Sequence, residues 1–153
     1  MSLRVVFDTN VIVSAMLTSD GVCAHLLLLA IDGLAIPVID ARILHEYERV
    51  LRRPKFKLAP EAVNGVLRFL EETAETHVAL PLNITLPDAS DLPFLEVAAT
   101  ANACLVTGNV RHFPESIIRG VFAPANPRGV LVLTPADALK LLADGTCTAV
   151  EVP

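Results

Sequence analysis

The sequence predicts an α/β fold: three layers, α/β/α, around a central, mostly parallel sheet of about five strands. Short apolar runs typical of buried strands alternate along the chain with longer segments of helical periodicity. The hydrophobic residues make up 53% of the chain and are mostly aliphatic, with no Trp and one Tyr. This composition suits parallel strands that are covered by helices on both faces.

The first half of the chain carries clear start and stop signals. An apolar run at 3–7 predicts the first strand, and helices are expected at 11–16 and 22–31, where Gly33 ends the second. A second strand follows at 34–39. Asp40 is a favourable N-cap for a helix at 41–53, and Pro54 stops it.

The second half is read in the same way. Pro60 opens a helix to about residue 70, and a third strand is expected at 77–80 before a loop at 81–93. A helix at 94–103 leads into a fourth strand at 104–107, and a short helix is expected within 111–121. A turn-rich connection at 124–129 precedes a fifth strand at 130–133 and a helix at 135–142.

Length and composition predict one globular domain, residues 1–144, and a C-terminal tail at 145–153. The longest unbroken apolar stretch, at 26–31, is far shorter than a membrane span, and the start of the chain does not resemble a leader peptide. Three cysteines at wide spacing match neither a disulfide framework nor a zinc site. We therefore expect a cytoplasmic protein with reduced thiols and no membrane association.

The net charge of −5 argues against a large, general nucleic-acid-binding surface. The cations are nevertheless concentrated, because five of the twelve Lys and Arg residues fall within nine positions. These are Arg49, Arg52, Arg53, Lys55 and Lys57. A local basic rim suits a phosphodiester substrate, and a solvated helix end with favourable dipole interactions explains the same cluster equally well.

Three carboxylates stand where an α/β sheet would bring them to a common pocket. Asp8 follows the first strand, Asp91 precedes the helix that leads into the fourth strand, and Glu46 leans toward the apolar face of its helix. Strand ends in such sheets are where ligands bind, and Mg²⁺ and Mn²⁺ are held by a few carboxylates. Each acid also has an ordinary interpretation, as a helix cap for the aspartates and as an Arg49 or Arg53 partner for Glu46.

Neighbouring polar residues extend this candidate site. Thr9, Asn10, Asp88 and Thr107 stand beside the acids as supporting groups. Asn109 follows a Thr-Gly turn after the fourth strand and is a neutral candidate ligand, while His112 is placed to touch a substrate. Taken alone, Thr107-Gly108-Asn109 is also an ordinary turn signal.

Together these segments resemble the PIN-domain family, and in particular the single-domain, VapC-like toxins of bacterial toxin–antitoxin pairs. The resemblance is carried, in family order, by residues 6–11, 46–56, 88–91 and 105–109. It implies a three-layer α/β fold whose clustered acids bind Mg²⁺ or Mn²⁺ and cleave phosphodiester bonds, usually in RNA. By motif position Asp8, Glu46 and Asp91 match the principal acids, and Asn109 stands where many members carry a fourth aspartate.

The resemblance also implies an antitoxin protein as partner and a homodimer as the assembly, alongside an RNA substrate. Two other interpretations remain open at this point. A PIN-like module that binds RNA or a partner without cleaving is compatible with the loss of charge at Asn109. A phosphatase of the haloacid dehalogenase type is disfavoured, because it needs an acid two residues after its nucleophile and Asn10 occupies that position.

Overall fold

The computed structural model describes residues 2–121 and 129–144. Five strands form one sheet in the order β3-β2-β1-β4-β5, and every neighbouring pair is parallel. The strands are β1 (Leu3–Phe7), β2 (Ala35–Ile39), β3 (Glu75–Thr76), β4 (Cys104–Val106) and β5 (Val132–Leu133). The predicted α/β class and five-strand parallel sheet are confirmed.

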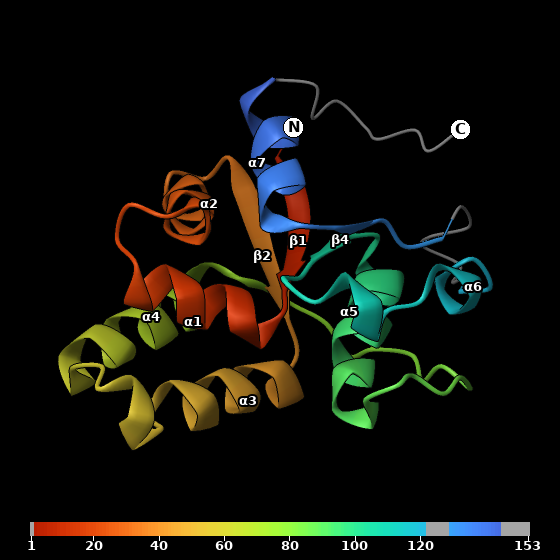
Figure 1. Cartoon of the computed structure of the whole chain (residues 1–153), viewed down its shortest axis with the longest axis horizontal. Coiled ribbons are helices and arrows are strands. Elements are labelled where there is room, and N and C mark those ends of the chain that lie inside the picture. Colours follow the sequence, from red (N-terminus) through yellow and green to blue (C-terminus); the bar gives the residue numbers. More distant parts are fainter. Residues whose placement is uncertain (1, 122–128, 145–153) are drawn as a thin grey trace.

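Helices cover both faces of this sheet (Figure 1). They are α1 (Thr9–Leu17), α2 (Val22–Ile31), α3 (Ala41–Leu51), α4 (Pro60–Thr73), α5 (Leu92–Ala101), α6 (Glu115–Ile118) and α7 (Pro135–Ala143). Helix α5 packs against β1, β2 and β4, whereas α2 packs on β2 and against α7. Figure 1 shows α1 to α4 on one side of the central strands and α5 and α6 on the other. The apolar core therefore lies in two layers, one on each face of the sheet.

Strand β1 is the centre of the sheet and fixes where its neighbours end. Phe7 lies opposite Val106 of β4, and the next backbone N–H, that of Asp8, donates to the Val106 carbonyl at 2.9 Å. Strand β2 likewise ends at Ile39, and Asp40 caps α3 by accepting from the Ile43 N–H at 2.9 Å. The predicted cap at Asp40 is confirmed. The residues after β1, β2 and β4 thus meet at one edge of the sheet.

Tyr47 joins helix α3 to the end of β1. Its side chain is 1% exposed, and its hydroxyl donates to the backbone carbonyl of Phe7. Burial, together with the nearby charges of Asp8 and Asp40, raises the pKa of this phenol well above its ordinary value. The hydroxyl is therefore a neutral, fully committed donor that sets the distance between α3 and β1.

The third strand was predicted at the wrong place. It comprises Glu75–Thr76, and residues 77–80 are not part of a strand. The reason lies in α5, because the backbone N–H of Leu80 donates to the Thr100 hydroxyl at 2.9 Å and that of Leu82 donates to Glu96 at 2.7 Å. Side chains of a helix thus satisfy the backbone groups that a strand partner would otherwise take.

Smaller differences concern element boundaries. Strand β5 is shorter than predicted, and the segment 111–121 contains two short elements, a 3₁₀ turn at Val110–His112 and α6, rather than one helix. Further 3₁₀ turns lie at Pro54–Phe56 and Ala89–Asp91, the second inside the predicted loop. Most of the predicted turn at 124–129 and the whole of the predicted tail, 145–153, lie outside the described residues.

Within the described ranges, no single helix has the length and apolar composition that a membrane crossing needs. Helices α1 and α2 meet that requirement only when taken together, and they are bent by 100° at their junction.

Removing the Tyr47 hydroxyl tests its role as the link between α3 and β1. We expect Tyr47→Phe to lower the free energy of unfolding by about 1–2 kcal/mol, because the buried Phe7 carbonyl loses its side-chain donor. Urea denaturation measures this value. Thr73→Ala is the matched control, since it removes a hydroxyl-to-carbonyl bond at an exposed site. Equal losses in the two variants would contradict the assignment.

Candidate functional site

Asp8 is the best-enclosed acid at the carboxyl edge of the sheet. It is 5% exposed, and its Oδ1 accepts from the Thr9 N–H at 2.8 Å, which caps α1. Its Oδ2 accepts from the Thr107 hydroxyl at 2.7 Å and from the Asn10 amide at 3.3 Å. Burial raises the pKa of Asp8 above its ordinary value, even though the bonds from Thr107 and Thr9 act in the opposite direction.

Thr107 connects β4 to this carboxylate. The side chain is completely buried, and its hydroxyl both donates to Asp8 and accepts from the Asn109 N–H at 2.9 Å. The turn after β4 is thereby fixed to the turn after β1. Thr9 contributes through its backbone, because its own hydroxyl is buried and has no hydrogen-bond partner in the part of the chain that the structure describes.

A second group of acids lies at the start of α5. Asp91 is buried and its Oδ2 is 2.9 Å from Nδ1 of His112. One ligand atom from each of Asp88, Asp91 and His112 lies within 4.8 Å of the others, which makes this trio a possible metal-binding group. Asp88 is exposed, and hydrogen bonds from the Ser90 hydroxyl and N–H lower the pKa of its carboxyl.

The two groups of acids influence each other. Burial raises the pKa of Asp91 to about 6, and the negative charge of Asp8 adds to this effect, while the His112 hydrogen bond opposes it. The charge of Glu46 also raises the pKa of Asp8. Asp8 therefore lies close enough to repel both Glu46 and Asp91, and a cation beside Asp8 would relieve that repulsion.

Glu46 itself is half-buried and has a partner. Its Oε2 accepts from Arg49 at 2.9 Å, as the ordinary interpretation of this residue expected. Of the other predicted substrate-binding cations, Arg52 donates to Asn64 of α4 at 2.7 Å and lies 3.5 Å from Glu48. Lys55 stacks over the ring of Phe56, and Arg53 is exposed. The basic cluster is thus partly engaged in contacts around the end of α3.

The donor set fits a hard divalent cation. Its core is the trio of Asp88, Asp91 and His112, and Asp8 is near enough for its charge to raise the pKa of Asp91. Mg²⁺ and Mn²⁺ prefer such oxygen-rich surroundings. Asn109 offers an amide oxygen at the same edge. Burial is the main cause of the raised pKa values of Asp8 and Asp91, and neighbouring carboxylates add to it, so a bound cation would stabilise the charged form of both acids.

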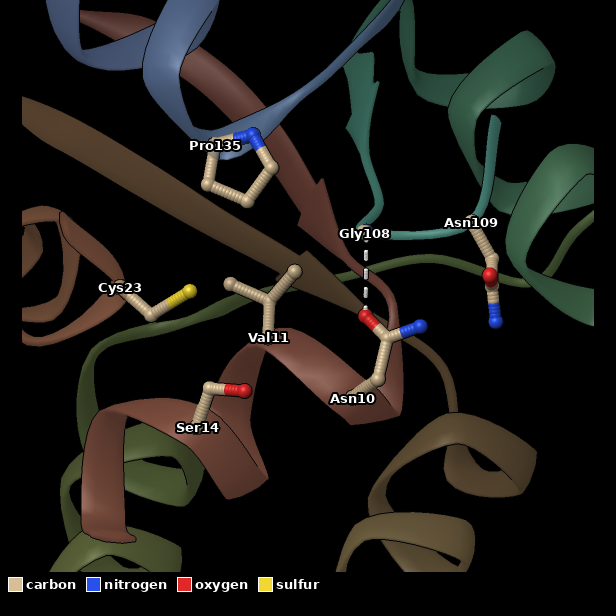
Figure 2. A pocket seen from close by; sticks show the side chains of 7 residues that line it. All are labelled: Asn10, Val11, Ser14, Cys23, Gly108, Asn109 and Pro135. Atoms are coloured by element: carbon tan, nitrogen blue, oxygen red, sulfur yellow. Dashed lines mark hydrogen bonds between the residues drawn. The ribbon is translucent and has the colours of Figure 1, made fainter. Parts of the chain in front are cut away.

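A small pocket of about 230 Å³ adjoins this acidic site (Figure 2). It lies between the first turns of α1, the start of α2, the turn after β4 and the start of α7. Its lining residues are Asn10, Val11, Ser14, Cys23, Gly108, Asn109 and Pro135. Figure 2 shows Cys23 and Ser14 on one side and the two asparagine side chains on the other. The sequence motifs include Asn10, Val11, Gly108 and Asn109, but no motif pointed to Ser14, Cys23 or Pro135.

A network on the opposite side of the edge was also missed. Glu96 of α5 is buried, and its two oxygens accept from Arg42 at 2.8 Å and from the Leu82 N–H at 2.7 Å. Arg42 also bonds Asp40 at 2.8 Å. The arrangement holds the loop before α5 against α3, and therefore positions the segment that carries Asp88 and Asp91. A buried glutamate in an apolar helix was the available signal.

Comparisons with known proteins agree with the α/β fold. A family model described as the PIN domain matches residues 4–111. Among solved structures, the chain is similar to one in the crystal structure of VapBC2 from Rickettsia felis bound to a DNA fragment from their promoter. The TM-score is 0.54 at 19% identity, over 86% of this chain and 98% of that one. No curated protein matches.

Replacing Asp91 tests the electrostatic coupling through the pH dependence of stability. Folded Asp91 binds its proton more tightly than the unfolded chain, because the pKa rises from 3.8 to about 6. Its stabilising contribution is therefore present below 3.8 and is lost as the pH rises through about 6. In EDTA, we expect the unfolding free energy of the wild type, relative to Asp91→Asn, to fall across this window.

Denaturant titrations at a series of pH values measure this difference. Asp20→Asn, which removes an exposed carboxylate from the turn between α1 and α2, is the control. If the unfolding free energies of Asp91→Asn and Asp20→Asn changed with pH in the same way, the electrostatic coupling would be contradicted.

Proposed function

This chain belongs to the PIN-domain family, and from that membership we propose that it is a metal-dependent endoribonuclease that hydrolyses RNA phosphodiester bonds. One observation carries the proposal: two buried aspartates with raised pKa values, Asp8 and Asp91, lie at the carboxyl edge of the sheet, where such folds bind ligands, and the charge of Asp8 adds to the rise at Asp91. A structural role alone would not require two buried acids to face each other. In this proposal the two acids bind a metal ion, and the metal ion contacts the phosphodiester.

In this proposal Asp8, Glu46 and Asp91 are the catalytic acids, and Asn109 completes the set of metal ligands. When Mg²⁺ or Mn²⁺ is bound, it supplies Lewis acidity and lowers the pKa of a coordinated water. Thr107 and the Thr9 N–H hold the Asp8 carboxylate in one orientation, and Asn10 adds a weaker bond. Asp88 and His112 hold or extend the environment of Asp91.

The substrate side of the proposal rests on the cations near the end of α3. Arg49, Arg53 and Lys55 are exposed, and Arg49 lies directly beside Glu46. They would contact phosphates that flank the cleaved bond. Arg52 is a weaker candidate, because its contacts to Asn64 and Glu48 already engage it.

An alternative function is a PIN-like module that binds RNA or a protein without cleaving. The neutral Asn109 at the fourth acidic position favours it, because one negative charge fewer weakens a second metal site. Metal-dependent cleavage that is lost in Asp8→Asn separates the two functions.

We further propose that the protein is the toxin of a toxin–antitoxin pair, acts in the cytoplasm and forms a homodimer. The similar Rickettsia felis structure is of a complex named VapBC2, which supports an antitoxin as partner. Exposed apolar side chains on and after α2 supply a surface for association: Val22, Leu28, Ile31 and Leu34. Copurification with the product of a neighbouring gene and light scattering test these two points.

Metal binding is expected to stabilise the fold. With Mn²⁺ at about 100 times its Kd, the melting temperature should rise by about 5 °C or more, because the cation binds only the folded acidic site. Thermal unfolding of the wild type with Mn²⁺, Mg²⁺ or EDTA measures the shift. Asp8→Asn should lose most of it, and a metal-independent melting temperature in the wild type would refute the metal site.

Cleavage should depend on the residues that orient Asp8 as well as on Asp8 itself. We expect Asp8→Asn to abolish metal-dependent cleavage of structured or single-stranded RNA, and Thr107→Val to reduce it about 10–100-fold through misplacement of the carboxylate. Gel assays with Mn²⁺, Mg²⁺ and EDTA measure the rates. Thr73→Val is the matched control at an exposed helix position. Full activity in Asp8→Asn would exclude the proposed nuclease.

A further inference from the structure

The pocket beside Asp8 has a polar edge with a defined hydrogen-bonding pattern. Oδ1 of Asn10 accepts from the Gly108 N–H at 3.2 Å, and this bond turns Nδ2 toward Asp8, 3.3 Å from Oδ2. One N–H of this amide remains for a ligand. The Asn109 amide makes no side-chain hydrogen bond within residues 2–121 and 129–144, and Figure 2 shows it on the same side as Nδ2 of Asn10. The edge thus offers a fixed donor and an adaptable donor–acceptor pair.

The rest of the pocket is apolar or weakly polar. Val11 and Pro135 present hydrocarbon, and Cys23 and Ser14 close the far side (Figure 2). None of the lining residues carries a formal charge, and burial raises the pKa of the Cys23 thiol, which keeps it neutral. A phosphate group finds no cation here. A flat, neutral ring with polar atoms on its edge matches both walls.

The pocket lies directly beside the Asp8 carboxylate. Asn10 lines the pocket and also bonds the Asp8 carboxylate, and the Asn109 N–H bonds the hydroxyl of Thr107 that holds the same carboxylate. The pocket and the proposed phosphate-cleaving site therefore share a wall. A phosphodiester at Asp8 would place an attached nucleoside next to this opening.

We infer that this pocket binds the nucleobase of one nucleotide next to the cleaved phosphodiester, and that Asn10 and Asn109 read its edge. The inference rests on the proposed nuclease function and adds a base preference to it. The volume of about 230 Å³ is below the about 300–1,000 Å³ typical of pockets for drug-sized ligands, which suits a single base. Asparagine amides are common readers of base edges. In this role Nδ2 of Asn109 donates to the base while Oδ1 remains the candidate metal ligand, a combination that an aspartate, which has no N–H, does not offer.

The first test fills the pocket. Ser14 is an exposed residue of α1, and Ser14→Leu places a larger side chain at the pocket in a residue type that favours helices. We expect KM for RNA to rise about tenfold, the scale of a lost base contact, while kcat stays within about twofold. Sequencing of cleavage products from a random RNA pool should show a base preference beside the cut in the wild type that flattens in the variant.

Ser116→Leu in α6 makes the same substitution at an exposed helix position that does not line the pocket, and it should behave as the wild type. Unchanged KM and unchanged base preference in Ser14→Leu would overturn the inference.

A second test does not depend on cleavage. In EDTA, N-ethylmaleimide alkylates accessible thiols, and mass spectrometry of the peptide that carries Cys23 gives its labelling rate. We expect at least one of the four nucleoside 5′-monophosphates to slow this labelling in the wild type but not in Ser14→Leu, and inorganic phosphate to have no effect. No protection by any nucleotide, or equal protection by phosphate, would overturn the base site.

The two assays separate the two proposals. RNA cleavage that needs Asp8, without nucleotide protection of Cys23, would support the nuclease and refute the base pocket. Protection of Cys23 without any metal-dependent cleavage would support the pocket as a nucleotide site and refute the nuclease.

Discussion

The burial of the Asp8 carboxylate is the constraint around which the edge of this sheet is built. An acid that is 5% exposed must be hydrogen-bonded, and three groups from two separate segments satisfy it. The need for the Thr107 hydroxyl fixes where β4 ends beside β1. Tyr47 holds α3 against β1, because its hydroxyl donates to the carbonyl of the residue immediately before Asp8. The hydrogen bonds that offset the cost of burying the Asp8 carboxylate therefore also position the turns that carry the candidate site.

Burying these acids lowers the stability of the metal-free protein at neutral pH, but it suits the proposed cation-binding role. Asp8 and Asp91 both hold protons more tightly than ordinary aspartates, so the metal-free edge is electrostatically strained at neutral pH. Groups of this kind are typical of sites that bind cations or carry out acid–base chemistry. Asn109 reduces the number of like charges at the edge. Under the proposed base-binding role, a neutral side chain that contacts the substrate stands where a further carboxylate would strengthen cation binding.

Much of the fold was predictable because local signals agreed with it. The apolar run of β1, the cap at Asp40 and the proline at the start of α7 all specify elements without tertiary information. The third strand was misplaced because the His77 N–H is the last in that segment to bond β2, at the Ile39 carbonyl, and the Leu80 N–H instead donates to the Thr100 hydroxyl of α5. Motif order predicted Asp8, Glu46 and Asp91 as the principal acids, and that role stays a prediction. The pocket was not, since Ser14, Cys23 and Pro135 come from three elements and acquire a common surface only through packing.

The bond from Thr107 to Asp8 joins residues that are 99 positions apart, and the Thr107 N–H in turn donates to the Leu133 carbonyl. A growing chain therefore cannot assemble the site until nearly all of it has left the ribosome. At about 5–20 residues per second, about 5–20 s separate the synthesis of the two partners. During that interval the residues of α1 to α4 have already been synthesised. Asp8, which precedes them, still lacks its hydrogen-bond partner Thr107 at the end of β4. A binding protein that recognises only these early helices would meet the nascent chain before it has any means of cutting RNA.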